Sequence, residues 1–188
     1  MARSAASSRG PGALRAALLA LGALLLGAAW LSAGMPRAQA AHLEPAPGVV
    51  GVDAGRSLAW ILRTRNGAAL IDAGYDRDAR ALLAELRAQG LDASKVHTVL
   101  ITHGHPDHWA GAAMFPAARV LAGAGDVPLL LGKARLRGPA SFALSRVMPP
   151  PLPQVTAVAD GQVLDVDGEE VRAIALPGHT PGSTAYLW

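Results

Sequence analysis

The sequence contains no cysteine, so disulfides and thiolate metal ligands are excluded within its 188 residues. Any metal would have to be held by histidine and carboxylate side chains. The absence of cysteine does not fix the compartment, because exported proteins can fold without disulfides. Half of the residues are apolar (51%), and the length suits one domain with a real core.

Acidic residues are absent before Glu44, while four arginines lie within residues 1–40. Three of these arginines precede an apolar run over residues 16–30, and an Ala-x-Ala triplet ends at Ala40. This pattern is typical of a cleaved secretory signal peptide. An uncleaved membrane anchor is the alternative, because the apolar run approaches spanning length. We therefore expect an exported chain, periplasmic or secreted, that meets a membrane only through its N-terminal segment.

Lysine is scarce beyond residue 40, where only Lys95 and Lys133 occur. Without the four N-terminal arginines, 13 of the 17 basic side chains remain against 14 acidic ones, a net charge of −1. A nucleic-acid-binding surface needs clustered lysine and arginine on the folded part of a chain. The composition therefore argues against nucleic acid as a partner.

Hydrophobic periodicity and turn residues predict alternating strands and helices after a loose, proline-rich lead-in over residues 41–48. Strands are expected at 49–53, 57–63, 68–72, 96–102, 120–121, 162–166, 170–175 and 183–188, and helices at 78–89, 109–115 and 126–131. Asn66-Gly67 predicts a hairpin turn with positive φ at both positions, and Asp167-Gly168 joins a later pair of strands. Residues 132–154, basic and then proline-rich, form either a loop or helical lid over the sheet or a solvated connector.

Four potential metal ligands lie within six residues, directly after the strand expected at 96–102. They are His103, His105, Asp107 and His108. The neutral nitrogen of histidine and the anionic oxygen of aspartate suit Zn²⁺ or another first-row ion. Gly104 and Pro106 fit a tight irregular loop, which can turn close-spaced side chains toward one point as a regular strand cannot. The cluster predicts a metal site, the alternative being a polar loop with solvated histidines.

A further histidine, His179, lies between two Pro-Gly pairs and again follows a predicted strand. Alone it could be a turn residue, but beside the first cluster it is a candidate for the ligand that completes the site. His97, at a strand start, is expected to be structural, and His42 is expected to face solvent. The acidic residues between 160 and 170 are expected to form a solvated turn, since no calcium loop of the EF-hand kind is present.

The patterns His-x-His-x-Asp-His and Gly-His-Thr-Pro-Gly-Ser together resemble the metallo-β-lactamase superfamily. Leu70-Ile71-Asp72-Ala73-Gly74 matches another motif of that superfamily, and the resemblance runs from about residue 49 to the end. It implies an α/β (α+β) fold, the αβ/βα sandwich, with about its first half over residues 49–188. It also implies that Asp72, with Gly74, supports the metal loop without being a ligand. The first histidine motif is specific for the superfamily, and neither histidine motif is specific for a substrate.

The resemblance further implies zinc, with two ions in the full-length protein. His103, His105 and His179 would hold one ion, while Asp107 and His108 would supply the other. Asp107 would also be catalytic, orienting a bridging hydroxide and passing its proton to the leaving group. That hydroxide would attack an ester, thioester or amide carbonyl of a small-molecule substrate, a β-lactam being one such substrate.

Later ligands of the superfamily would lie beyond Trp188, so the 188-residue chain is expected to be a fragment with little or no activity. His108 directly after Asp107 resembles the glyoxalase II type and the subclass B3 lactamases. The expected export favours a lactamase-like or other extracytoplasmic hydrolase. Two alternatives remain: an enzyme with a single iron ion that resembles persulfide dioxygenases, and a truncated metal-binding module without activity.

Overall fold

The computed structural model describes residues 43–135 and 148–188. The predicted signal peptide and most of the predicted lid therefore lie outside the described residues. In the part of the chain that is described, no helix is both long enough and apolar enough to cross a membrane.

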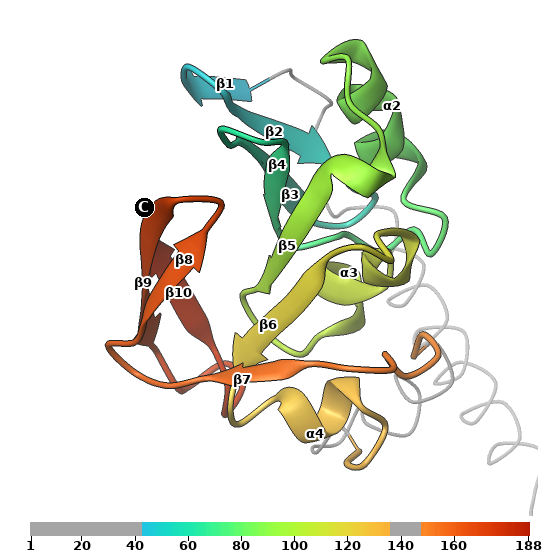
Figure 1. The fold of residues 1–188 in the computed structure, drawn as a ribbon. Helices are drawn as coiled ribbons and strands as arrows, with labels where there is room; N and C mark the ends of the chain where they lie inside the picture. The colour runs from blue at the N-terminus through green and yellow to red at the C-terminus, as the bar shows by residue number, and fades with distance from the viewer. Residues whose placement is uncertain (1–42, 136–147) are drawn as a thin grey trace, which may run out of the picture. The chain divides into compact units, whose positions relative to one another are not determined.

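Seven strands form the first sheet, and their spatial order follows the sequence (Figure 1). They are β1 (Leu43–Ala46), β2 (Val49–Asp53), β3 (Leu58–Arg63), β4 (Ala68–Ile71), β5 (Val96–Ile101), β6 (Arg119–Gly123) and β7 (Thr156–Val158). The first four strands pair antiparallel, and β4 to β7 pair parallel. The carboxyl ends of the parallel strands therefore meet at one edge of the sheet, which is where ligands bind in open sheets of this kind.

Helical segments cover one face of this sheet. They are α2 (Arg80–Ala88), the 3-10 turn η1 (Ala93–Lys95), α3 (Pro106–Trp109), the 3-10 turn η2 (Ala112–Met114) and α4 (Val127–Leu130). The apolar side of α2 presents Leu82 and Leu86, which are fully buried in the core shared with the sheet. Gly90 ends this helical segment with a φ of 73°, a conformation that glycine adopts without steric cost.

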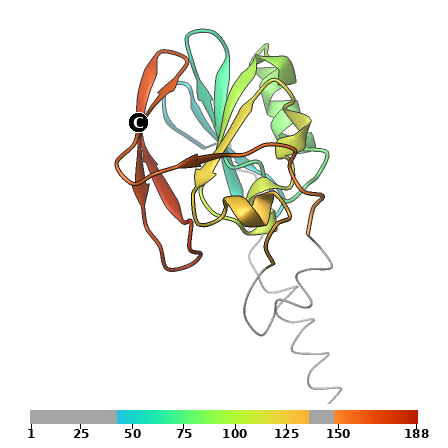
Figure 2. The ribbon, with the colours of Figure 1, turned by 60° about the horizontal axis from the view of Figure 1, so that its bottom comes forward.

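A second, antiparallel sheet packs on the opposite face and has the order β10-β9-β8. Its strands are β8 (Val163–Val166), β9 (Glu169–Ala175) and β10 (Thr184–Leu187). Alternate residues of β8 and β9 are buried against Leu100 and Leu121 of the first sheet. Figure 2 shows the first sheet between α2 and the second sheet. The predicted mixed α/β fold is confirmed.

Three local predictions need correction, and the first concerns the lead-in over residues 41–48. Residues 43–46 of it form the edge strand β1, which pairs with β2. An edge strand tolerates Pro45, because a residue there need not donate to a neighbour.

The second correction concerns the helix predicted at 109–115, which begins earlier, at Pro106. Proline is favoured in the first turn of a helix, where its missing N–H has no intrahelical partner. Asp107 and His108 consequently lie on a helical turn rather than in an irregular loop, and the second half of the predicted helix is the 3-10 turn η2.

The third correction concerns the turn at Asn66-Gly67. The turn joins β3 to β4 as predicted, but neither residue has the positive φ that was expected. The Thr64 N–H instead donates to the Gly67 carbonyl at 3.0 Å and closes a longer loop. Glycine is required there for space, because a Cβ on Gly67 would lie 2.2 Å from the Lys95 carbonyl oxygen. The Asp167-Gly168 turn does have positive φ at both positions, 55° and 88°.

Candidate metal centre

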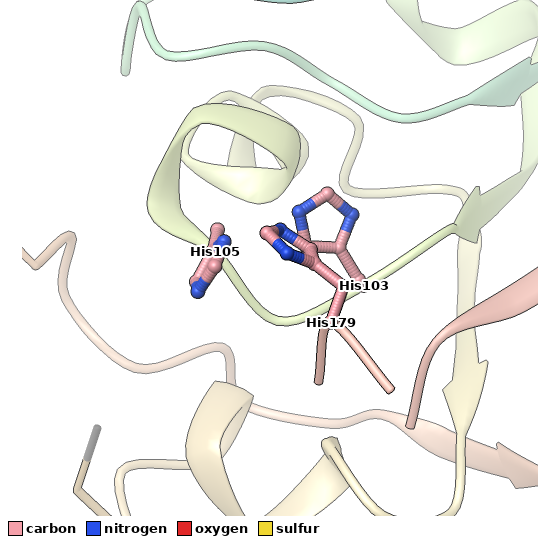
Figure 3. A group of neighbouring side chains, drawn as sticks. All are labelled: His103, His105 and His179. Carbon is pink, nitrogen blue, oxygen red and sulfur yellow. The ribbon is translucent and has the colours of Figure 1, made fainter. Parts of the chain in front are cut away.

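Three histidines from two distant segments come together at the carboxyl edge of the first sheet. His103 and His105 follow β5, whereas His179 lies in the loop between β9 and β10. Each ring offers one nitrogen, and these nitrogens all lie within 4.8 Å of one another. The ring centroids are 4.5 to 5.0 Å apart, and Figure 3 shows the three rings gathered side by side. The structure therefore brings together the two segments that the sequence analysis paired.

The surroundings favour uncharged imidazoles at this point. Burial, together with the like charges of the neighbouring imidazoles, lowers the pKa of His103 to about 3. Burial and the ring of His179 also lower the pKa of His105, against the opposite effect of the Asp107 carboxylate. A neutral imidazole keeps the nitrogen lone pair that a cation needs. His103 and His105 therefore offer nitrogen lone pairs to a metal ion at neutral pH.

The first turn of α3 adds two further candidates beside the three histidines. The ring of His108 lies 3.9 Å from that of His103, and its Nε2 is 3.8 Å from the Asp107 carboxylate. Burial lowers the pKa of His108, but the hydrogen bond and charge of Asp72, with the charge of Asp107, outweigh it and raise the pKa overall. The pair lies where a second ion was predicted, and its role as a ligand pair stays a prediction.

Asp72 supports the loop that carries the first cluster. It follows β4, and its buried carboxylate accepts hydrogen bonds from the Thr102 N–H and hydroxyl, each at 2.8 Å. It also accepts from His108 Nδ1 at 2.7 Å, which leaves Nε2 of that ring facing the site. Gly74 allows a close approach next to it, because a Cβ there would lie 2.2 Å from that of Ala54. The contacts of Asp72 reach the loop after β5, whereas the contact of Gly74 is with Ala54. The supporting role that the resemblance implied for both residues stays a prediction.

Sequence reasoning missed Asp126, a buried aspartate between the two histidine loops. It was interpreted only as the first residue of a helix, yet its carboxylate makes no capping hydrogen bond to α4. The carboxylate instead accepts from the Gly104 N–H at 2.8 Å, the Thr180 hydroxyl at 2.5 Å and the Gly182 N–H at 3.0 Å. One signal could have found it: Asp126 follows β6, the parallel neighbour of β5, at the same sheet edge.

His97 has the structural contact that was expected of it, at the other end of β5. Its Nδ1 lies 2.9 Å from the Asp167 carboxylate, which also accepts from the Thr64 hydroxyl at 2.7 Å. The prediction of a merely solvated acidic turn is therefore wrong for Asp167, whose side chain is only 15% exposed. The reason is that its turn reaches the first sheet rather than open solvent.

Comparisons with known proteins agree with this geometry. The family model of the metallo-beta-lactamase superfamily matches residues 52–187. A hydroxyacylglutathione hydrolase from Acidiphilium cryptum is 35% identical over 131 residues, which cover 69% of this chain and 44% of that protein. An atrochrysone carboxyl ACP thioesterase from Aspergillus fumigatus is 33% identical over 133 residues, which cover 68% of this chain and 35% of that protein.

A solved structure agrees with these relatives. The SMB-1 metallo-beta-lactamase is similar with a TM-score of 0.62 and 32% identity, over 75% of this chain and 55% of that one. The chain thus spans less than half the length of the curated relatives named above and about half of this neighbour.

Proposed function

Because the chain belongs to the metallo-beta-lactamase superfamily, we propose that the protein is a zinc-dependent hydrolase of an ester, thioester or amide bond in a small molecule. The observation that carries the proposal is the convergence of three imidazoles, with ligand nitrogens within 4.8 Å of one another. The names of the relatives, a hydrolase and a thioesterase, support the same class of reaction. The proposal concerns the whole protein, since the chain covers only part of each relative.

The donor set fits zinc, which takes neutral imidazole and carboxylate ligands. His103, His105 and His179 would hold one ion, and Asp107 with His108 would contribute to a second. Bound zinc supplies Lewis acidity, which polarises a carbonyl and lowers the pKa of water toward neutrality. Asp107, whose side chain is one-third exposed and lies 3.8 Å from His108 Nε2, would receive a proton and pass it to a leaving group. His108, held by Asp72, would keep its Nε2 pointed at the same space.

Among the three bond types we favour the thioester. The curated relatives include a protein named as a thioesterase and another named as a hydroxyacylglutathione hydrolase, whereas the similar solved structure is a lactamase. The test is to compare hydrolysis of a lactoyl thioester and of nitrocefin by the zinc-loaded whole protein. We expect faster turnover of the thioester.

The matched variants for this assay are His103→Ala and His97→Ala. Loss of a metal ligand should reduce turnover by about 100-fold or more, while loss of the histidine at the far end of β5 should leave most of it. No hydrolysis of either substrate by the zinc-loaded protein would reject the preference for the thioester and would leave lactone, sulfate or phosphodiester substrates to be tested.

Two alternatives from the sequence stay predictions and have their own tests. Metal analysis of protein purified from its native host separates zinc from the single iron ion of a persulfide dioxygenase-like enzyme. Calorimetric zinc titration and turnover of the 188-residue chain test whether it is inactive alone. Two tightly bound zinc ions with normal turnover would contradict that expectation.

We also propose that residues 1–40 direct export of the protein. Support comes from the arginine-rich start, the apolar run and the Ala-x-Ala triplet. Cell fractionation with N-terminal sequencing tests this, and we expect an extracytoplasmic protein that begins at Ala41. A protein that starts at Met1 in the membrane fraction would favour the anchor instead.

A further inference from the structure

The two histidine loops belong to different sheets, so their relative position depends on contacts between the loops. The first follows β5 in the large sheet, and the second joins β9 to β10 in the small one. Backbone contacts begin this connection, because the Thr184 N–H donates to the Thr102 carbonyl at 2.8 Å. That bond lies several residues from His179 on the chain. Contacts nearer to His179 are needed to hold its imidazole beside the other two.

Asp126 provides these contacts, because both oxygens of its buried carboxylate accept hydrogen bonds from the two loops. Oδ2 accepts from the Gly104 N–H and the Thr180 hydroxyl, and Oδ1 accepts from the Gly182 N–H. The anchored atoms are next to the ligands in the chain: Gly104 lies between His103 and His105, and Thr180 directly follows His179. A shift of this carboxylate would therefore shift all three imidazoles.

Glycines let both loops approach the aspartate. A Cβ on Gly182 would lie 2.4 Å from the Asp126 nitrogen, and one on Gly125 would lie 2.5 Å from the Pro181 carbonyl oxygen. A Cβ on Gly104 would lie 3.1 Å from Asp126 Cγ. A side chain at any of these three positions would clash with its neighbours, so glycine is what lets both loops lie against Asp126. The two loops are therefore closely packed around Asp126 as well as hydrogen-bonded to it.

The loop of His179 is also tied within itself. The Ser183 hydroxyl accepts from the Thr180 N–H at 3.0 Å and lies 2.9 Å from the Thr180 hydroxyl. The Gly178 N–H donates to the Thr180 carbonyl at 3.2 Å. Because these bonds make the turn compact, a carboxylate that holds Thr180 also holds the residue before it.

We propose that Asp126 is a positioning residue, which fixes the two histidine loops relative to each other and so sets the arrangement of His103, His105 and His179. It would contact neither metal nor substrate. The inference rests on the proposed metal site. It concerns the placement of the imidazoles in this chain, which can be measured without metal.

The first test replaces Asp126 by asparagine, which has nearly the same shape. An amide has one acceptor oxygen and a donor NH₂ group, so at least one of the three donors loses its partner. Asp92→Asn is the matched control, because Asp92 accepts the Ser94 N–H at 2.8 Å in η1, at the far end of β5. A second pair of variants acts on the other side of one bond: Thr180→Val removes the hydroxyl, and Thr180→Ser keeps it.

Two measurements on the full chain compare the variants with the parent. The nitrogen resonances of the three imidazoles, recorded without metal, report their surroundings. Zinc affinity, measured by competition with a chelator, reports how well they converge. We expect Asp126→Asn to shift the resonances and to weaken zinc binding by about 10- to 100-fold, the usual cost of losing a group that orients ligands. Thr180→Val should change both in the same direction, while Thr180→Ser and Asp92→Asn stay close to the parent.

A folded Asp126→Asn chain with parental resonances and parental zinc affinity would overturn the proposal. If that variant fails to fold, the Thr180 pair decides, and identical values for valine and serine would overturn it. If the parent chain itself binds no zinc, the three-histidine site on which the proposed function rests fails in this chain, whereas the imidazole resonances of the metal-free variants still decide the role of Asp126.

Discussion

Asp72, which follows β4, orders the histidine loop after β5 through hydrogen bonds. Its backbone has a φ of 62°, uncommon outside glycine, asparagine and aspartate, and its side chain is only 3% exposed. Burial of a carboxylate is costly unless the group is well hydrogen-bonded. Here three hydrogen bonds satisfy it, two from Thr102 and one from His108. The aspartate therefore couples the end of β4 to the loop after β5.

Replacing Asp72 by asparagine tests that coupling. Asparagine also tolerates the positive φ, so the backbone should keep its conformation. One or more of the three partly buried donors would lose an acceptor, and we expect the free energy of unfolding to fall by about 2 kcal/mol. Urea denaturation of the metal-free chain measures this, with Asp92→Asn as the exposed control. An equal loss in both variants would contradict the role assigned to Asp72.

The residues at the site were predictable to different degrees. His103, His105, Asp107 and His108 stand out because they crowd six positions after an apolar run, and such a density of imidazole and carboxylate groups is typical of metal sites. Asp126 did not stand out, because an aspartate before a helix is also the usual capping pattern. Only the packing of two loops from different sheets shows that its carboxylate turns away from α4.

At the scale of elements, Gly67 and Gly90 serve turns for different reasons. Gly67 has no positive φ, but a Cβ on it would lie 2.2 Å from the Lys95 carbonyl oxygen. Gly90 has a φ of 73° and open space around it. We expect Gly67→Ala to lower the free energy of unfolding by about 3 kcal/mol, because the clash is with backbone. Gly90→Ala should cost about 1 kcal/mol, the strain of a left-handed alanine. Denaturation of the two variants in parallel checks this order, and the reverse order would show that the clash at Gly67 is relieved more easily than the φ strain at Gly90.

The β8–β9 turn is joined to the first sheet through Asp167. Burial raises the pKa of its carboxyl, but hydrogen bonds from Thr64 and His97, with the charges of His97 and Arg119, lower it overall below 3.8. A carboxyl with a lowered folded pKa contributes stability that is fully present above the unfolded value of 3.8. This contribution is lost as the pH falls through the lower pKa of the folded state.

Asp167→Asn should therefore show a pH-dependent cost. Asparagine keeps the positive φ of the turn but cannot carry the charge. The variant should be less stable than the parent at neutral pH, and the difference should shrink as the pH falls below 3.8. Chemical denaturation of both chains across this range measures it. A stability difference that does not change with pH would mean that the charge of the Asp167 carboxylate does not stabilise the contact between the β8–β9 turn and the first sheet.

Most strands and helices were predictable because each carries a local signal. Alternation and apolar runs mark the strands, and Gly90 marks the end of the helical segment at α2. The early start of α3 at Pro106 was missed because the ligand spacing was interpreted as an irregular loop. The edge strand β1 was missed because its pairing with β2 is a tertiary contact, and a proline-rich segment carries little strand signal of its own.

At the scale of the molecule, the site depends on the contact between two sheets. The large sheet brings the ends of β4, β5 and β6 to one edge, and the small sheet contributes the loop with His179. Buried side chains such as Val166 and Val171 pack the small sheet against Leu100 of the large one. The sequence shows both histidine segments, but their meeting depends on this packing, which the family resemblance implied and local patterns did not contain.

The most direct test of this account is calorimetric zinc titration of the chain beside two single-histidine variants. The nitrogens of His103, His105 and His179 lie within 4.8 Å of one another, whereas His97 pairs with Asp167 at the other end of β5. We predict tight zinc binding by the parent and by His97→Ala, with a loss of about 100-fold or more in His179→Ala, which corresponds to about 2.8 kcal/mol. Equal zinc affinity in the parent and His179→Ala would contradict the claim that the two loops form one metal site.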